Sequence, residues 1–148
     1  MTYQEKKSIV SVVSTVLIFL IYCLYRYPQR PEFGLDSTDT FRYWGSFVLV
    51  LTIVSILAHI VISIGFTIIF RITTKEKEPG FADELDRLIE LKSHRNSFFV
   101  FILGFVLAMG ALVLEQPSDI MFIILIAAGF LSDLTGSISK LYHYRRGV

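Results

Sequence analysis

The sequence contains a single cysteine, Cys23, which lies within a long apolar run. One thiol excludes a disulfide framework and a cysteine-based metal site within one chain. Lysine and arginine number 14 against 13 aspartates and glutamates, so the formal net charge is only +1. A chain without a basic excess carries no electrostatic signature of nucleic-acid binding. We therefore expect no direct contact with nucleic acid.

The sequence also lacks the motifs of common catalytic sites. It has no His-Glu-x-x-His pair, no phosphate-binding loop, and no Ser-His-Asp set that would lie at one depth of a membrane. Nothing in it supports a lipid-modifying activity. We therefore predict that the protein is not an enzyme and uses no cofactor.

Long apolar runs dominate the chain instead. Apolar residues make up 53% of its 148 residues, more than the roughly 45–50% of soluble domains. Crossing a bilayer core takes about 17–25 helical residues, and four apolar blocks are long enough. The sequence thus predicts an all-α, polytopic membrane protein, with residues 1–148 forming a single membrane domain. Its four transmembrane helices are expected at residues 9–25, 44–70, 98–114 and 120–138.

The lengths of the first two blocks add to this prediction. Block 44–70 measures roughly 40 Å at about 1.5 Å per residue, so we expect it to tilt or to extend past the lipid. Block 9–25 is too long for the core of a signal peptide, and no small-residue cleavage site follows it. We expect it to remain in the protein as a transmembrane helix.

Basic residues are concentrated on one side of the predicted helices. Eleven lie near the two termini or between the second and third blocks, and three lie in the first connection. Because basic residues are retained on the cytoplasmic side, we expect both termini and residues 71–96 in the cytoplasm. The protein is then a multi-pass protein of the cell inner membrane, with the lipid bilayer as its surroundings. Aromatic belts are expected at Tyr25, Tyr27, Tyr43 and Trp44 outside and at Tyr142 and Tyr144 inside.

Residues 81–96 form a charged helical pattern that runs directly into the third apolar block. Phe81, Leu85, Leu88 and Ile89 repeat at helical spacing, which predicts a buried face. No helix breaker follows, so we expect a cytoplasmic helix that is continuous with the third transmembrane helix. Its charged residues are candidates for contact with a cytoplasmic partner. They are Asp83, Glu84, Asp86, Arg87, Glu90 and His94.

Three of these charged residues raise the alternative of a metal site. Asp86, Glu90 and His94 align at one-turn intervals, but a metal would need further ligands, such as His143 from the C-terminal segment. Carboxylate and imidazole at this spacing are a weak signal unless a second helix supplies its own pair. We therefore favour a solvated polar face and expect no metal.

The stretch DELDRLIELKSHRNSFFVF, followed by a helix hairpin, resembles an uncharacterised family of small four-helix prokaryotic membrane proteins, defined as a domain of unknown function. The resemblance covers roughly the second half of the chain. It implies an inner-membrane protein, often encoded beside a helix-turn-helix regulator, and hence a regulatory role with that regulator as cytoplasmic partner. Leu85 and Ser93 stand where the family usually has Arg and Ala. The residues that match the family's Asp-Glu-Arg-like motif are Asp83, Glu84, Ile89 and Lys92.

Polar and small residues recur at helical spacing within the apolar blocks. Small residues four apart allow membrane helices to approach closely, and hydroxyl groups can form hydrogen bonds between helices. The pattern therefore predicts either helix packing or a polar cavity for a ligand or ion. The polar stripe comprises Thr52, Ser55, His59, Ser63 and Thr67; the small residues are Gly104, Ala108, Ala128, Ser132 and Gly136.

His59 and Asp133 are ionisable residues within the membrane, where such groups are costly and suggest function. Counted at about 1.5 Å per residue from the outer ends of their blocks, they lie about 22 Å and 21 Å deep. We expect His59 and Asp133 to face each other, with Gly104 leaving room for them. Ser14 and Thr15 reach the same depth, and their hydroxyl groups can satisfy the remaining polar atoms. Alternatively, Asp133 extends toward the inner surface, and then no pair exists.

Two functional hypotheses follow from these features. The favoured hypothesis is a regulatory or interaction protein that uses the cytoplasmic helix as its contact surface. The alternative is a small transporter that works as a homo-oligomer, with His59 and Asp133 as its coupling pair.

Overall fold

The computed structural model describes residues 3–32, 38–74 and 84–146. Within these residues the chain forms four α-helices and one short 3-10 helix, η1 (Tyr27–Gln29), and no strand. Each α-helix is long and apolar enough to cross a membrane. The all-α, four-span architecture predicted from the sequence is therefore confirmed. The helices are α1 (Tyr3–Arg26), α2 (Thr38–Thr74), α3 (Glu84–Val113) and α4 (Ser118–Arg146).

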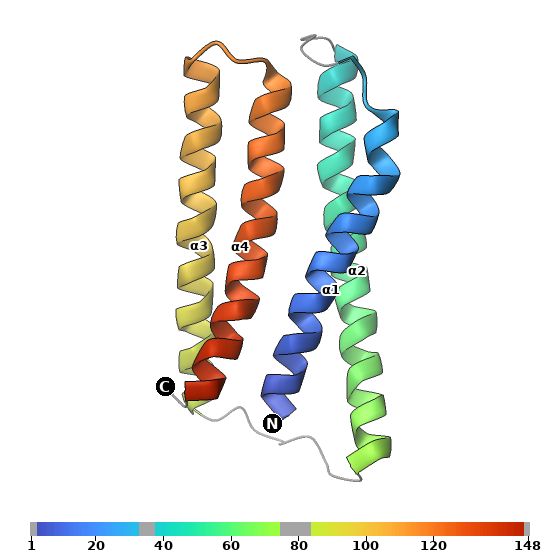
Figure 1. The fold of residues 1–148 in the computed structure, drawn as a ribbon, viewed down its shortest axis with the longest axis vertical. Helices are drawn as coiled ribbons and strands as arrows, with labels where there is room; N and C mark the ends of the chain where they lie inside the picture. The colour runs from blue at the N-terminus through green and yellow to red at the C-terminus, as the bar shows by residue number, and fades with distance from the viewer. Residues whose placement is uncertain (1–2, 33–37, 75–83, 147–148) are drawn as a thin grey trace.

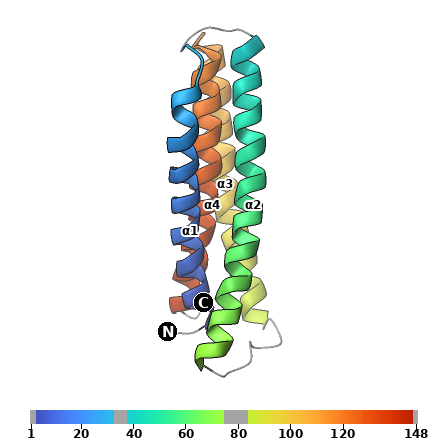
Figure 2. The same ribbon diagram turned by 90° about the vertical axis from the view of Figure 1, so that its right-hand side faces the viewer.

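The helices form two antiparallel hairpins, α1 with α2 and α3 with α4 (Figure 1). The first residue of α1 and the last residue of α4 lie at the same end of the bundle. α4 also packs against α1, as the view from the side of α1 and α2 indicates (Figure 2). Within the described part of the chain, α3 contacts neither α1 nor α2, and α2 touches α4 only slightly. The bundle is therefore open along one side, between α2 and the second hairpin.

Small residues bring α3 and α4 into close contact. A Cβ on Gly104 would clash with the Cβ of Ala128, and a Cβ on Gly136 would lie 3.4 Å from the hydroxyl of Ser97. Ser97 and Ser132 donate reciprocally to each other's carbonyl groups at 2.6 and 2.8 Å. Close approach of this kind is what small residues permit in membranes. Gly104 thus serves helix packing, and the expectation that it leaves room for His59 and Asp133 is wrong.

Three helices, α2, α3 and α4, extend well beyond the length that a bilayer core requires. α2 has 37 residues, or about 55 Å at 1.5 Å per residue, against a core about 30 Å thick. α3 has 30 residues and continues without a break from its charged part into its apolar part. The predicted helical extension of the third transmembrane helix is therefore present from Glu84 onward. Phe81 and Asp83 lie outside the described residues.

The turn between α3 and α4 ends α3 before Pro117. Glu115 adopts a left-handed conformation with φ of 55°. The amides of Glu115 and Gln116 donate to the carbonyl groups of Leu112 and Ala111, both at 3.0 Å. This is the Schellman arrangement that closes helix C-termini. Because it closes α3 before Pro117, α4 begins at Ser118, two residues before the expected transmembrane block.

The buried face of the charged part of α3 differs from the prediction. Ile89 and Ser93 are fully buried, whereas Leu85 is 39% and Leu88 is 52% exposed. Since α4 is the one helix in the described structure that contacts α3, Ile89 and Ser93 face α4. Close packing against α4 selects a small side chain such as Ser93 at the contact, which turns two of the leucines outward.

Trp44 occupies the interior rather than the expected outer aromatic belt. It is 8% exposed and clusters with Tyr22 and Phe47. Its indole Nε1 donates to the carboxylate of buried Asp119. An indole that can bury its ring and satisfy its N–H gains more inside than at the lipid surface. Tyr25 and Tyr27, in contrast, are exposed, as the belt requires.

Candidate functional site

The open side of the bundle contains a large cleft between α2 and α4. Its volume is about 990 Å³, and α1 and α3 also contribute to its walls. Most of the lining is apolar, and aromatic rings are prominent in it. The phenylalanines that line the cleft are Phe19, Phe101, Phe122 and Phe130.

The cleft exists because the helices around it pack unevenly. Phe19 of α1 stacks on Phe130 of α4, with ring centroids 4.1 Å apart, so these helices are held together. At the end of the bundle near the start of α2, Phe122 of α4 stacks on Trp44 of α2 at 6.0 Å. Between these contacts α2 remains apart from α4, and Thr52, Ser55 and His59 of its polar stripe face the space that is left.

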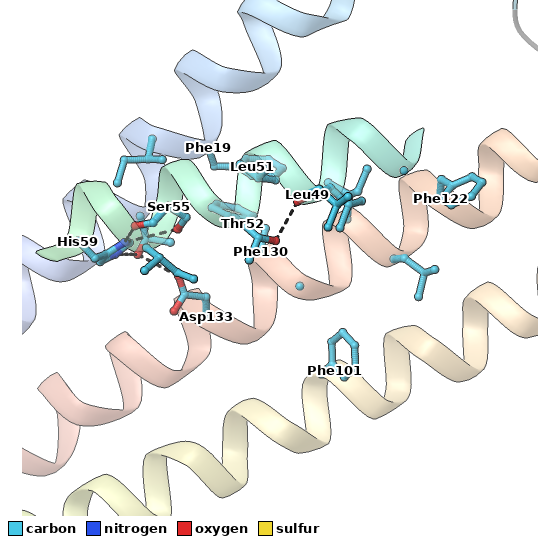
Figure 3. A pocket seen from close by; sticks show the side chains of 18 of the residues that line it. Phe19, Leu49, Leu51, Thr52, Ser55, His59, Phe101, Phe122, Phe130 and Asp133 are labelled. Carbon is cyan, nitrogen blue, oxygen red and sulfur yellow. Dashed lines mark hydrogen bonds between the residues drawn. The ribbon is translucent and has the colours of Figure 1, made fainter. Parts of the chain in front are cut away.

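Polar side chains gather at one end of this cleft. Ser55, His59 and Asp133 lie together there, whereas Phe122 lies toward the other end (Figure 3). Thr15 also lines this end and is 5% exposed. His59 comes from α2, Asp133 from α4 and Thr15 from α1, so three helices meet at one polar cluster, the Thr15–His59–Asp133 cluster.

The hydrogen bonds of His59 fix the position of one ring proton. Nδ1 lies 2.8 Å from the carbonyl oxygen of Ser55, one turn earlier in α2. A carbonyl oxygen only accepts, so Nδ1 carries a hydrogen. The other ring nitrogen, Nε2, lies 3.1 Å from the hydroxyl oxygen of Thr15. That hydroxyl group lies 3.3 Å from Oδ2 of Asp133. Thr15 therefore bridges the imidazole and the carboxylate.

Both hydrogen bonds of this bridge can form at the same time if the cluster holds one shared proton. In one arrangement an imidazolium His59 donates to Thr15, which donates to the carboxylate of Asp133. In the other, a protonated Asp133 donates to Thr15, which donates to a neutral His59. Both arrangements satisfy both hydrogen bonds and contain the same number of protons. If the shared proton leaves, Thr15 has one hydrogen for two acceptors, and one of the two bonds is lost.

The structure joins the predicted intramembrane residues, but not by direct contact. No hydrogen bond or ion pair links His59 to Asp133 in the described part of the chain; Thr15 stands between them. Ser14 is buried but takes part in none of these hydrogen bonds. The alternative in which Asp133 reaches toward the inner surface is not what the structure shows, because its carboxylate bonds to Thr15.

The predicted contact residues on the charged part of α3 divide into two groups. Oε1 of Glu90 lies 3.3 Å from Nζ of Lys140 on α4. Tyr144 lies beyond the apolar block of α4. Burial first, and then the nearby carboxylates of Asp86 and Glu90, raise the pKa of Tyr144 to about 12. These two acids therefore face α4. Glu90 itself remains exposed, as do Glu84, Arg87 and His94.

The alternative of a metal site gains nothing from the structure. Among the described residues, no group of three or more His, Cys, Asp or Glu side chains could hold a metal ion. Nδ1 of His143, the suggested fourth ligand, lies 2.7 Å from the carbonyl oxygen of Ser139 in its own helix.

Sequence reasoning missed a row of hydroxyl groups where α1 meets α4. Ser11 and Ser137 are hydrogen-bonded at 3.3 Å, one helical turn nearer the chain termini than Thr15 and Asp133. A small polar groove follows, lined by Ser8, Lys7, Lys140 and Glu90 among others. The signal was the spacing of Ser8, Ser11 and Thr15 on one face of α1, which pairs with the face of Asp133 and Ser137 on α4.

Comparison with protein-family models, with curated proteins and with solved structures finds no match for this chain. The four apolar helices define its class as a multi-pass membrane protein built as a helical bundle.

Proposed function

We propose that the protein is a small membrane transporter in which the Thr15–His59–Asp133 cluster couples a proton to a solute held in the cleft. The observation that carries this proposal is the bridge itself. Two ionisable side chains from different helices are joined by hydrogen bonds through Thr15, at the end of a cavity large enough for a ligand. Ionisable groups within apolar helices mark ion and substrate pathways more often than they stabilise structure.

The hydroxyl row between α1 and α4 supports a proton route to this cluster. Ser11 and Ser137 lie between Asp133 and the groove around Lys140. With the basic residues of the chain on the cytoplasmic side, that groove opens to the cytoplasm, and both termini lie there. The family resemblance implies that the membrane is a prokaryotic inner membrane. We expect the transporter to work as a homo-oligomer in which the open side of the cleft still faces the lipid.

The test is proton movement in lipid vesicles that contain the purified protein and an internal pH indicator. Lipophilic cations, lipophilic anions and neutral amphiphiles are added in turn to the outside. At least one class should move protons with the wild-type protein and with Asp39→Asn, an exposed carboxylate at the far end of α2. Asp133→Asn should abolish the signal. Proton movement with none of the three classes would overturn the proposal.

A second function is favoured by a different observation, on the charged part of α3. Leu88 is 52% and Leu91 is 68% exposed, and Arg87 and Glu84 flank them. Exposed leucines between charges, beyond the apolar block, are typical of a surface that contacts another protein. We propose this surface as the docking site for a cytoplasmic regulator of the helix-turn-helix kind, which the family resemblance implies.

The docking proposal is tested by co-expression with the regulator encoded beside the chain's gene and purification in mild detergent. The two proteins should elute together at a fixed ratio, and Leu91→Ser should separate them. Tyr142→Ser is the matched control and should leave the complex intact. Tyr142 is an exposed residue of α4 at the end of the bundle that also carries the charged part of α3. Equal recovery of the regulator with both variants would reject the docking site.

A further inference from the structure

We propose that the ligand of the cleft is a lipophilic organic monocation, which enters from the bilayer and displaces the proton of the Thr15–His59–Asp133 cluster. This inference names the substrate class of the transporter proposed above and rests on that function. It is argued from the charge, the shape and the opening of the cleft.

The charges that line the cleft select a cation. Asp133 is the one carboxylate among the described lining residues, and none of them is a lysine or an arginine. Asp133 is exposed to the cleft, and Thr15 engages its Oδ2. The other carboxylate oxygen, Oδ1, is therefore available to a ligand. In an apolar cavity, a carboxylate attracts a cation far more strongly than it does in water.

The titratable groups around Asp133 are few on every helix that surrounds it. α2 presents His59, whereas α1 presents Thr15 and α3 presents Phe101. Along α4, the next charged group toward the termini is Lys140, which lies two turns away and pairs with Glu90. The proton shared by His59 and Asp133 is thus the charge that a cation has to replace.

The rest of the lining suits an apolar, ring-bearing body. Phe19, Phe101, Phe122 and Phe130 come from three helices and face one space. Aromatic faces attract cations as well as apolar groups. A volume of about 990 Å³ lies at the upper end of the roughly 300–1,000 Å³ of small-molecule sites. A small inorganic ion would leave most of this space unfilled.

The opening of the cleft points to entry from the lipid. α2 does not contact α3 in the described structure, so the mouth lies between membrane helices and faces sideways. Residues of α2 around it, such as Leu49, Ile56 and Ile60, are exposed and apolar. A ligand that partitions into the bilayer reaches this mouth without crossing a polar barrier.

Binding of the cation has a fixed relation to the proton. One carboxylate compensates one positive charge, so the cation and the shared proton compete for Asp133. The proton leaves to bulk solvent as the cation enters, which leaves the imidazole of His59 neutral and Asp133 as a carboxylate. Because binding releases a proton, the affinity for the cation rises with pH, by up to about tenfold per pH unit for one proton exchanged.

The experiment is equilibrium binding to the purified protein in mild detergent, with tetraphenylphosphonium and its isosteric anion tetraphenylborate as probes. The single tryptophan of the chain, Trp44, stacks on the cleft residue Phe122, so its fluorescence reports occupancy. The cation should bind, and the anion should bind at least about tenfold more weakly, because the carboxylate repels it. Raising the pH should strengthen binding of the cation.

Two variants, each with a control variant, complete the test. Asp133→Asn should weaken cation binding at least about tenfold, because it removes the charge partner, whereas Asp39→Asn should not change it. Thr15→Val should reduce the pH dependence of binding, since the bridge that shares the proton is lost. Thr73→Val is its control, because the Thr73 hydroxyl donates to Ile69 within α2, away from the cleft. If Asp133→Asn fails to fold, the binding of the two probes to the wild-type protein, and its pH dependence, still test the inference.

Several results would overturn the inference. Equal binding of cation and anion, at a pH-independent affinity, would indicate an apolar site such as one for a lipid chain. Stronger binding of the anion would assign the opposite charge. Proton movement driven by a solute of another class, without cation binding, would overturn this inference and support the transport function.

Cation binding without proton movement in vesicles would instead support this inference and overturn the transport function.

Discussion

Glu90 on α3 and Lys140 on α4 form an ion pair across the second hairpin, with 3.3 Å between Oε1 and Nζ. The side chains are 58% and 31% exposed, respectively. The acidic face of the charged helix is thus partly engaged within the protein. An exposed pair of this kind contributes about 0–1 kcal/mol, because water screens it and two long side chains are ordered.

The first prediction concerns this ion pair. Glu90→Gln should lower the free energy of unfolding in detergent by no more than about 1 kcal/mol, and added salt should shrink the difference. Glu90→Lys should destabilise further, because it places two ammonium groups together. Combining Glu90→Lys with Lys140→Glu should restore most of the loss. Membrane insertion should be unchanged in all of these variants, because the pair lies outside the apolar blocks. A defect in insertion would show instead that the charged helix is part of the folding core.

The second prediction concerns the tightest contact between α3 and α4. Gly104→Ala places a methyl group against Ala128, and we expect it to destabilise the protein by about 1–3 kcal/mol, as overpacking does. Gly110→Ala on the same helix is the control, because nothing lies within 4 Å of the added carbon. It should be neutral or stabilising by up to about 1 kcal/mol, since alanine favours a helix. Thermal unfolding of both variants in one detergent is the measurement. Equal effects of the two substitutions would contradict the packing.

The spans were predictable from the sequence, whereas the faces of the helices were not. Apolar length alone identifies a transmembrane helix, because lipid leaves the backbone no alternative partner. Lipid is as apolar as a protein interior, so hydrophobicity does not distinguish a packed face from a lipid-facing one. This is why Leu88 was expected inside and lies outside, and why the cleft-lining phenylalanines gave no signal. Small side chains are more informative, since Gly104 and Ser132 do lie between α3 and α4.

The depth of the polar cluster was predictable from the sequence, but the hydrogen bonds that join its residues were not. Counting residues placed His59, Asp133 and Thr15 at one level, and the structure joins all three there. Rotation about each helix axis decides which side chains meet, and residue counts do not fix it. The bridge through Thr15 depends on that rotation.

The third prediction concerns topology, with labelling sites chosen by exposure. Ser118 and Ser93 are 5% and 0% exposed, so cysteines there would react slowly from either side. Gln116 and His94 are exposed and suit the experiment better, in a Cys23→Ala background. With the charged segment in the cytoplasm, Gln116→Cys should react with a membrane-impermeant reagent in intact cells. His94→Cys should react only after the membrane is opened. The opposite pattern would invert the orientation and move the termini outside.

The last prediction tests whether Thr15 carries the coupling between His59 and Asp133. His59→Leu and Asp133→Leu, alone and together, form a double-mutant cycle on the free energy of unfolding in detergent. Either single change leaves the other ionisable group without its partner. The losses of unfolding free energy in the two single variants should therefore add up to more than the loss in the double variant. We expect a coupling energy of about 0.5–3 kcal/mol, the usual range for residues in one hydrogen-bond network.

The same cycle is then repeated with Thr15→Val and with Thr15→Ser. Valine keeps the shape of the side chain but removes the hydroxyl, so no atom remains to pass the proton between Nε2 of His59 and Oδ2 of Asp133. The coupling energy should therefore fall close to zero in the valine background and persist in the serine background. A coupling that survives Thr15→Val at full size would mean that His59 and Asp133 interact directly. The shared proton would then belong to a simple ion pair, and the role of α1 in the cluster would be limited to packing.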